Sequence, residues 1–382
     1  MKKITVVGGG NAGCFTALYC GWYGRQSDYE IELVYNPEIP PERVGQATVI
    51  EPPGLLWAAT GFNWYHNKIN ATFKSGILYE GWGKLNKEVF HPFPGDRMSM
   101  HFCPWEMQKS ILNSGHFKVK ESTVLDLDKI DSDYIFDCRG KPDNFDDYEE
   151  LKNPTNACIL GKPGTWWKVE DAHWSRHIAT PDGWMFVIPT HPDSPSHDYC
   201  VGYCYNKDIT PTEEAKSNFY GQYDVEIKKC IEYKNYVAKD PIVDDRICLN
   251  GNRLFFLEPL ESSSTQAYIE MVRAVFEYLL PGRCDKDYVV TDIKKYIKQL
   301  QNFVLWHYQF GSKYDTPFWD YAKTLKFEDK EFNDFFKYST ITDWNNIIPQ
   351  VYGGCTKPKL YGQWPAYSFK TWYDGMSTKL NI

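Results

Sequence analysis

The first 35 residues alternate between apolar runs and a glycine-rich turn. Residues 3 to 7 form an apolar, β-branched run that predicts a buried strand, and residues 14 to 24 carry apolar positions that suit a helix. A second strand is predicted over residues 30 to 35. Between the first strand and the helix lies a GxGxxG motif, which begins at Gly8. This order of elements is typical of a dinucleotide-binding fold.

The glycines of this motif have separate geometric roles. Gly8 permits a tight turn, Gly10 lets the backbone approach a pyrophosphate, and Gly13 lets the helix pack closely on the strand. The free amides and the dipole of the helix N-terminus, where Ala12 also lies, attract an anion. A glycine turn without a ligand is the alternative. The surrounding strands and helix favour dinucleotide binding.

The end of the second strand carries Asn36 where an acid usually binds the ribose. An amide can still donate and accept hydrogen bonds to ribose hydroxyls, and Glu38 lies close by in the sequence. The motif alone therefore leaves NAD and FAD both open.

The later segments give weaker signals. Residues 37 to 60 contain five prolines and are predicted to be rich in loops. Helices are predicted from Thr265 onward and again through Val289 to His307, with His307 as a core histidine. Strands are predicted at residues 71 to 82, 133 to 140, 183 to 189 and 198 to 205.

Composition narrows the class of protein. With 42% hydrophobic and 24% charged residues over 382 residues, the chain is expected to be globular rather than disordered. A net charge of −8 argues against a nucleic-acid partner, and no apolar segment approaches the length of a membrane span, so a cytoplasmic protein is expected. Eleven cysteines are expected to be free thiols. No metal is expected, because neither Cys200 and Cys204 nor His173 and His177 lie beside a second ligand pair.

Four further segments, in a fixed order, are more specific. They are VGQAT at residues 44 to 48, residues 71 to 77 leading to Trp82, residues 183 to 189, and LEPLES at residues 257 to 262. Together they resemble the flavin-dependent halogenases of the tryptophan halogenase type, over roughly residues 3 to 320. The resemblance implies an α/β, FAD-binding Rossmann-like fold of the flavin monooxygenase type with a β-sheet insertion. It also implies a flavin-binding region at 1–265 and a mainly helical substrate-side region at 266–382, packed as one unit.

The resemblance also implies an activity. Reduced FAD from a separate flavin reductase, O2 and chloride, bromide or iodide would give hypohalous acid. Lys74 would guide this oxidant to a free, electron-rich aromatic molecule of the phenol or indole type, and Glu261 would accept the proton that the ring loses. The halide would bind at Ser263 and Ser264. Beyond the residues of the glycine turn and Asn36, the flavin would be bound by Val44, Gly45, Gln46, Ala47, Trp184, Ile188 and Pro189.

Three positions depart from the family pattern. Gln46 replaces an acid, Phe186 replaces a tryptophan, and Ser264 stands where glycine is common. For the single residues, the alternatives to a role in catalysis are a solvated surface Lys74, a Glu261 that caps a helix and a serine that serves only as an N-cap. For the whole chain, the alternatives to a halogenase are an aromatic monooxygenase and a catalytically idle FAD-binding protein. Convergence of Lys74 and Glu261 in space is a prediction, and a homo-oligomer is compatible with the sequence.

Overall fold

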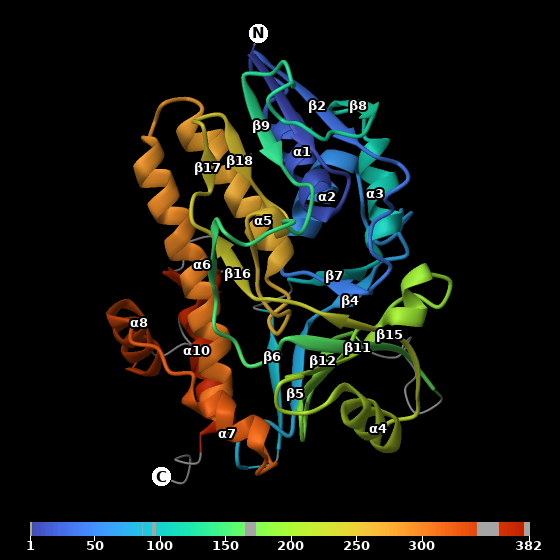
Figure 1. The fold of residues 1–382 in the computed structure, drawn as a ribbon, viewed down its shortest axis with the longest axis vertical. Helices are drawn as coiled ribbons and strands as arrows, with labels where there is room; N and C mark the ends of the chain where they lie inside the picture. Colours follow the sequence, from blue (N-terminus) through green and yellow to red (C-terminus); the bar gives the residue numbers. More distant parts are fainter. Residues whose placement is uncertain (1, 86, 94–96, 165–172, 342–358, 378–382) are drawn as a thin grey trace. The chain divides into compact units, whose positions relative to one another are not determined.

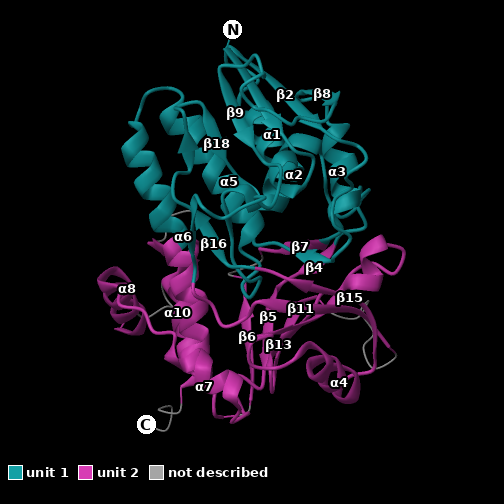
Figure 2. Cartoon of the chain, in the orientation of Figure 1, with its two compact units in different colours: residues 1–71, 102–151, 234–297 teal, residues 72–101, 152–233, 298–382 magenta. Residues whose placement is uncertain are grey.

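The computed structural model describes residues 2–85, 87–93, 97–164, 173–341 and 359–377. The chain forms two compact units, and each unit is assembled from three separate segments (Figure 2). Unit 1 consists of residues 1–71, 102–151 and 234–297, and unit 2 consists of residues 72–101, 152–233 and 298–382. The division of function at residue 265 stays a prediction.

Unit 1 is built on a six-stranded sheet (Figure 1). Neighbouring strands are parallel except for the pair β17–β18. Because parallel neighbours need a crossover, the chain passes from β1 to β2 through helix α1 (Asn11–Tyr23). The predicted strand, turn, helix and strand are confirmed. In sheet order, the strands are β17 (Ile242–Val243), β18 (Ile247–Leu249), β9 (Tyr134–Asp137), β1 (Lys2–Val7), β2 (Tyr29–Tyr35) and β8 (Lys118–Glu121).

Helix α1 lies unusually close to the first strand. A Cβ atom on Gly13 would lie 1.8 Å from the carbonyl oxygen of Gly8, so a side chain at this position would collide with the backbone. The helix is buried around most of its circumference, and Phe15 and Leu18 are fully inaccessible. This packing fixes the N-terminus of α1 against the carboxyl end of β1, where the candidate site lies.

The remaining elements of unit 1 include one that the sequence analysis missed. Helix α2 (Glu51–Thr60) lies inside the region that was predicted to be rich in loops, so that prediction is wrong for these residues. Pro52 and Pro53 are tolerated because the first turn of a helix leaves its N–H groups without intrahelical partners. The other elements are β3 (Gln46–Ala47), β10 (Tyr148–Glu150), β16 (Tyr236–Ala238), β19 (Phe255–Phe256), α3 (Pro104–Leu112), α5 (Ser264–Arg273) and the π-helix η4 (Ala274–Leu279).

Unit 2 is built on a seven-stranded sheet, in which all neighbouring pairs except β12–β5 are antiparallel. The strand predicted over residues 71 to 82 is divided at Ser75 into β4 (Thr72–Lys74) and β5. The first part pairs with β7 (Ser99–Phe102) and the second part joins the large sheet. In sheet order, the strands are β15 (Val225–Glu232), β11 (Ala157–Pro163), β14 (Val201–Tyr205), β13 (Gly183–Val187), β12 (Ser175–Thr180), β5 (Gly76–Glu80) and β6 (Glu88–Pro92).

The helices of unit 2 surround an aromatic core. Helix α6 (Lys286–Gln309) passes from unit 1 into unit 2, and His307 lies on its buried face. The His307 Nδ1–H donates to the carbonyl of Phe303 at 2.6 Å, and its ring centroid lies 4.0 Å from that of Trp372. The prediction of a hydrogen-bonded core histidine is confirmed. The other helices are α4 (Thr212–Gln222), α7 (Pro317–Thr324), α8 (Lys330–Ile341) and α10 (Ala366–Met376).

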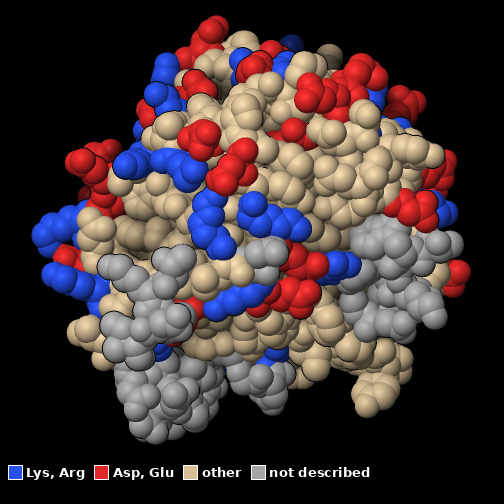
Figure 3. All heavy atoms as spheres, turned by 90° about the horizontal axis from the view of Figure 1, so that it is seen from below, with Lys and Arg blue, Asp and Glu red and all other residues tan. Residues whose placement is uncertain are grey.

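The described residues carry charges of both signs at the surface, and most of their cysteines are buried. The face in Figure 3 carries basic and acidic side chains, with several basic side chains next to one another near its middle. In the part of the chain that the structure describes, no helix is long and apolar enough to cross a membrane. Ten cysteines lie in the described ranges, all as free thiols. Within those ranges no three His, Cys, Asp or Glu side chains gather as a metal site.

Candidate functional site

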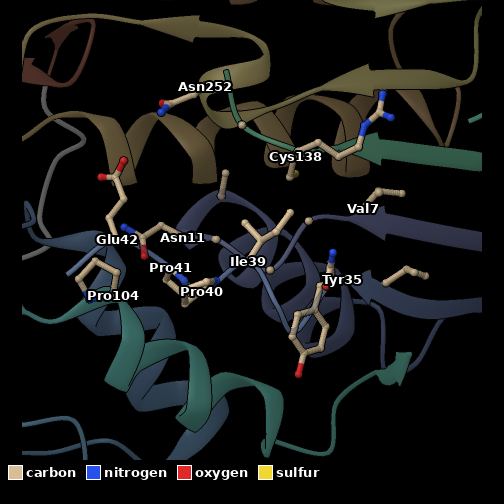
Figure 4. A pocket seen from close by; sticks show the side chains of 18 of the residues that line it. Val7, Asn11, Tyr35, Ile39, Pro40, Pro41, Glu42, Pro104, Cys138 and Asn252 are labelled. Carbon is tan, nitrogen blue, oxygen red and sulfur yellow. The ribbon is translucent and has the colours of Figure 1, made fainter. Parts of the chain in front are cut away.

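A cavity of about 330 Å³ opens in unit 1 at the carboxyl ends of β1 and β2 (Figure 4). This is the edge at which parallel α/β sheets bind ligands. Five of the predicted cofactor residues line the cavity: Gly8, Gly10, Ala12, Asn36 and Gln46. The predicted Gly13, Val44, Gly45 and Ala47 do not line it. Gly13 supports the turn from behind, and the other three flank Gln46 in the chain.

The glycine turn forms a cradle for a diphosphate. Gly8 has a φ of +121°, and a Cβ atom there would lie 2.4 Å from the carbonyl oxygen of Cys138. A Cβ atom on Gly10 would meet no protein atom within 4 Å, so this position faces open space. Helix α1 has no acidic residue in its first turn and no side-chain cap, so its first N–H groups are available to an anion. The cradle therefore fits the diphosphate of a dinucleotide.

The end of β2 contributes an amide to the cavity, and the loop that follows contributes an acid. The Asn36 Oδ1 accepts a hydrogen bond from the backbone N–H of Glu38 at 2.8 Å, which orients the Asn36 side chain. Glu38 does not line the cavity, whereas Glu42 does. Glu42 is the acid that lines the cavity, and it lies beside Asn11 and Pro104, away from Tyr35 at the end of β2 (Figure 4). The sequence analysis did not predict Glu42 as a cavity residue, because Glu42 lies in the proline-rich loop and not at the end of β2.

Amide side chains form the wall beside the cradle. The Asn11 Nδ2 donates to Gln46 Oε1 at 2.5 Å, and the Gln108 Nε2 donates to the carbonyl of Gly9 at 2.6 Å. Asn11 is the first residue of α1, so Gln46 is tied to the end of the helix that carries positive dipole charge. A neutral amide at Gln46 keeps negative charge away from the place where a diphosphate binds.

An arginine that is paired with a buried carboxylate lies at the wall of the same cavity. The Asp137 carboxylate is 2% exposed and accepts two hydrogen bonds from Arg139, each at 2.9 Å. This pairing raises the pKa of Arg139 and fixes its guanidinium at the cavity wall. The sequence analysis predicted the strand that ends at Asp137 and missed the role of Arg139 in lining the site.

Lys74 occupies the end of the short strand β4 in unit 2. Its side chain is fully buried, and the Nζ atom lies 5.5 Å from the centroid of the Phe93 ring. The alternative of a solvated surface lysine is therefore wrong. Lysine is among the residues that are most rarely buried, because removing its charge from water is costly. Its burial indicates a position specified by the fold.

A buried histidine faces the same strand. His101 on β7 lies opposite Thr72, and burial together with the positive charge of Lys74 holds its pKa well below the usual value. The Thr72 hydroxyl donates to the carbonyl of Pro189, so its oxygen accepts the His101 Nδ1–H at 3.1 Å. The His101 Nε2 then accepts from the Ser175 hydroxyl at 3.0 Å. His101 is thus a neutral imidazole with a hydrogen bond at each ring nitrogen. Its place beside β4 follows from the pairing register of β4 and β7, which the sequence pattern does not contain.

Glu261 and the two serines lie at the start of α5 in unit 1. Glu261 is 2% exposed, and Ser262 has a φ of +54°. Ser263 occupies the N-cap position without a capping hydrogen bond from its side chain, and the helix has no acid in its first turn. Its N-terminal amides are therefore available to a small anion. Lys74 belongs to unit 2, so its convergence with Glu261 stays a prediction.

The match to a family decides the assignment. The tryptophan halogenase family model matches residues 3–119 and 168–350, which is most of the chain. The chain belongs to the tryptophan halogenase family. The predicted resemblance is confirmed, and the matched residues include the glycine cradle, Lys74 and Glu261. No curated protein sequence matches the chain.

Solved structures of tryptophan halogenases share the fold. The tryptophan 6-halogenase SttH from Streptomyces toxytricini is 18% identical, with a TM-score of 0.77 over 99% of this chain and 91% of that chain. The tryptophan halogenase from Shewanella frigidimarina NCIMB 400 is 16% identical, with a TM-score of 0.77 over 99% and 89%. BrvH, a flavin-dependent halogenase from Brevundimonas sp. BAL3, is 16% identical, with a TM-score of 0.75 over 98% and 90%. The predicted fold class is confirmed.

Membership in the tryptophan halogenase family defines the class of enzyme and its cofactors. The chain is an FADH2-dependent halogenase that uses a halide and O2, and a separate flavin reductase supplies the reduced flavin. Its substrate is a small aromatic molecule.

Residues 183 to 189, one of the segments on which the predicted resemblance rests, contribute buried side chains to unit 2. Trp184 on β13 is fully buried, and its ring centroid lies 4.9 Å from that of His177. Phe186 packs over Gly202, where a Cβ atom would lie 2.1 Å from the phenyl ring. These contacts account for Trp184 and Phe186 as core residues. Contact of Trp184, Ile188 and Pro189 with the flavin stays a prediction.

Proposed function

We propose that this chain halogenates a free, electron-rich aromatic molecule of the phenol or indole type, with Lys74 as the residue that guides the oxidant. The observation that carries the proposal is the complete burial of Lys74 beside the neutral His101. The burial of a lysine in an enzyme of this class favours a role in catalysis over a role in solubility or in a surface ion pair.

The cradle in unit 1 supports the binding of FAD. The first N–H groups of α1 would bind the diphosphate between Gly8 and Gly10, and Asn36 would bond the ribose hydroxyls. When bound, FADH2 supplies the two electrons that let O2 oxidise a halide, so that FADH2, O2, a halide and one proton give FAD, hypohalous acid and water.

The second reaction joins the halogen to the aromatic ring. The ring carbon forms a bond to the halogen, the bond between halogen and oxygen breaks, and the ring then loses its proton as water forms. The Lys74 side chain can bind hypohalous acid by a hydrogen bond and orient it toward one ring position. Glu261, buried next to the start of α5, would accept the ring proton. The amides at Ser263 and Ser264 would bind the halide.

The test is a panel of halides and substrates. Purified protein is supplied with FAD, a generic flavin reductase, NADH and O2, together with chloride, bromide or iodide and a set of phenols and indoles. Mass spectrometry is expected to find the mass shift of one halogen in at least one product. Flavin turnover without any halogenated product would overturn the proposal.

The same panel separates an aromatic monooxygenase. With the halide omitted, a monooxygenase still adds oxygen to its substrate, whereas the proposed halogenase gives no product. Oxygenated products at the same yield with and without halide would favour the monooxygenase.

A further inference from the structure

A second cavity in unit 1 shares no lining residue with the flavin cavity. Its volume is about 410 Å³, and it lies between the segment α5–η4 and the first part of α6. This volume is within the range of sites that bind small molecules, roughly 300 to 1,000 Å³. None of the predicted catalytic, flavin or halide residues lines it. The halogenation reaction therefore leaves this cavity without a role.

Two rows of side chains form its walls. Each row places residues four positions apart, which brings them to one side of a helix. The small Ala274 lies in the middle of one row, so the wall is hollow at that point. The most deeply buried side chains of the lining include Met271, Val289 and Ile293, which are at most 3% exposed. These three side chains are apolar and form the floor of the cavity. The first row contains Glu270, Ala274 and Tyr278, and the second contains Tyr288, Asp292 and Tyr296.

The single arginine of the lining is committed to other groups. Arg273 donates to both oxygens of Glu270, at 2.8 and 2.9 Å, to the Tyr19 hydroxyl at 3.2 Å, and to Glu51. The Gln266 Nε2 also donates to Glu270, at 2.7 Å. These bonds hold the Glu270 carboxylate rigidly at the cavity and neutralise the arginine.

Two carboxylates, Glu270 and Asp292, line the cavity against one arginine, so the net charge of the lining is negative. Glu270 is mostly buried, and its pKa is raised by this burial and by the carboxylates of Glu277 and Asp292. A cation placed between Glu270 and Asp292 would stabilise both carboxylates. Tyrosine rings add to the attraction, because a cation is drawn to the face of an aromatic ring.

We propose that the cavity between α5–η4 and α6 binds a small organic cation, an ammonium group with carbon substituents. Asp292 and Glu270 would attract the charge, and the rings of Tyr288 and Tyr296 would contact the substituents. The apolar floor and the aromatic rings favour such a cation over a metal ion, which prefers a shell of oxygen ligands.

The experiment measures binding of tetramethylammonium and of putrescine to the full-length protein by isothermal titration calorimetry. Potassium chloride at equal ionic strength is the control ligand. Saturable binding of at least one organic cation, with none for potassium, is expected. If neither organic cation binds saturably, the proposal is overturned.

Matched variants locate the site. We expect Tyr288→Ala to weaken binding about threefold and Asp292→Asn about fivefold, as the loss of one exposed cation–π or charge contact implies. Ala274→Leu would fill the hollow and abolish binding without changing any charge. The controls are Tyr220→Ala on α4 and Asp287→Asn, an acid of α6 outside the lining.

The control variants also decide the outcome. Binding that the controls weaken as much as the cavity variants would place the cation elsewhere and overturn the proposal. Thermal unfolding curves establish that each variant is folded. Tyr288 is 62% exposed and Tyr220 is 72% exposed, so neither alanine substitution removes a core side chain.

Discussion

Gly10 and Gly13 belong to the same motif, but alanine at the two positions should have different effects. Gly10→Ala should weaken flavin binding, and Gly13→Ala should lower the stability of the fold. Gly10 precedes α1 with an extended backbone, φ −73° and ψ −174°, which alanine adopts without strain. Its added methyl group would meet no protein atom within 4 Å. Gly13 lies within α1, where the same methyl group would lie 1.8 Å from the carbonyl oxygen of Gly8.

The two substitutions differ in the free energies that they change. In Gly10→Ala, the weaker N-cap and the lower entropy of the unfolded chain nearly cancel, so the free energy of unfolding should change by less than about 0.5 kcal/mol. In Gly13→Ala, the helix must move away from the strand, which costs about 2 kcal/mol. At Gly10 the methyl group enters the cradle and displaces the diphosphate from an amide. Loss of one charge-assisted hydrogen bond should weaken FAD binding at least about tenfold.

The assays are urea unfolding, which gives the free energy of unfolding, and titration of FAD followed by flavin fluorescence. We expect Gly10→Ala to unfold like the unchanged protein and to bind FAD poorly, and Gly13→Ala to unfold at lower urea concentration. If Gly10→Ala binds FAD with unchanged affinity, the diphosphate does not occupy the cradle and the site assignment is refuted.

Three other predictions concern charge and buried hydrogen bonds. Gln46→Glu should weaken FAD binding about tenfold, because it places a carboxylate beside the diphosphate. The loss of affinity should be smaller at high salt, which the same FAD titration at two salt concentrations measures. The native fold keeps His101 neutral, whereas in the unfolded chain this histidine binds a proton near pH 6.5. As the pH is lowered from 6.5, the free energy of unfolding should therefore decrease by up to about 1.4 kcal/mol per pH unit. Unfolding curves at several pH values should show that His101→Gln lacks this contribution. The buried Asn250 side chain donates to the Thr16 hydroxyl and to the carbonyl of Tyr268, and it accepts from the backbone N–H of Gly251. Asn250→Ala should therefore lower the free energy of unfolding, measured by urea titration, by about 3 kcal/mol. A loss below about 1 kcal/mol would contradict a stabilising role of these hydrogen bonds.

The sequence was most informative where local patterns decide the structure. The first strand, the glycine turn and α1 are specified by apolar periodicity and by residues without side chains, and they were predicted within a few positions. The core role of His307 also followed from its place on an apolar helix face.

Other parts depend on contacts between distant segments. The division of the strand at Ser75 arises because its two sides pair with different partners, β7 and β12, which the local pattern does not contain. His101 and Glu42 reach their places through strand register and loop path. The helices α7, α8 and α10 were not located individually, although each of them is strongly amphipathic, so the local pattern could have predicted them.

The central claim is that Lys74 guides hypohalous acid to the aromatic substrate. The most direct measurement follows Lys74→Met, which keeps an unbranched apolar side chain as far as Cε and removes the terminal nitrogen. Aromatic product is measured by mass spectrometry, and free hypohalous acid is trapped in parallel by a halogen-accepting diketone. We predict that the variant still produces hypohalous acid from reduced flavin, while the halogenated aromatic product falls about 100-fold or more. Unchanged halogenation of the aromatic substrate by Lys74→Met would contradict the account.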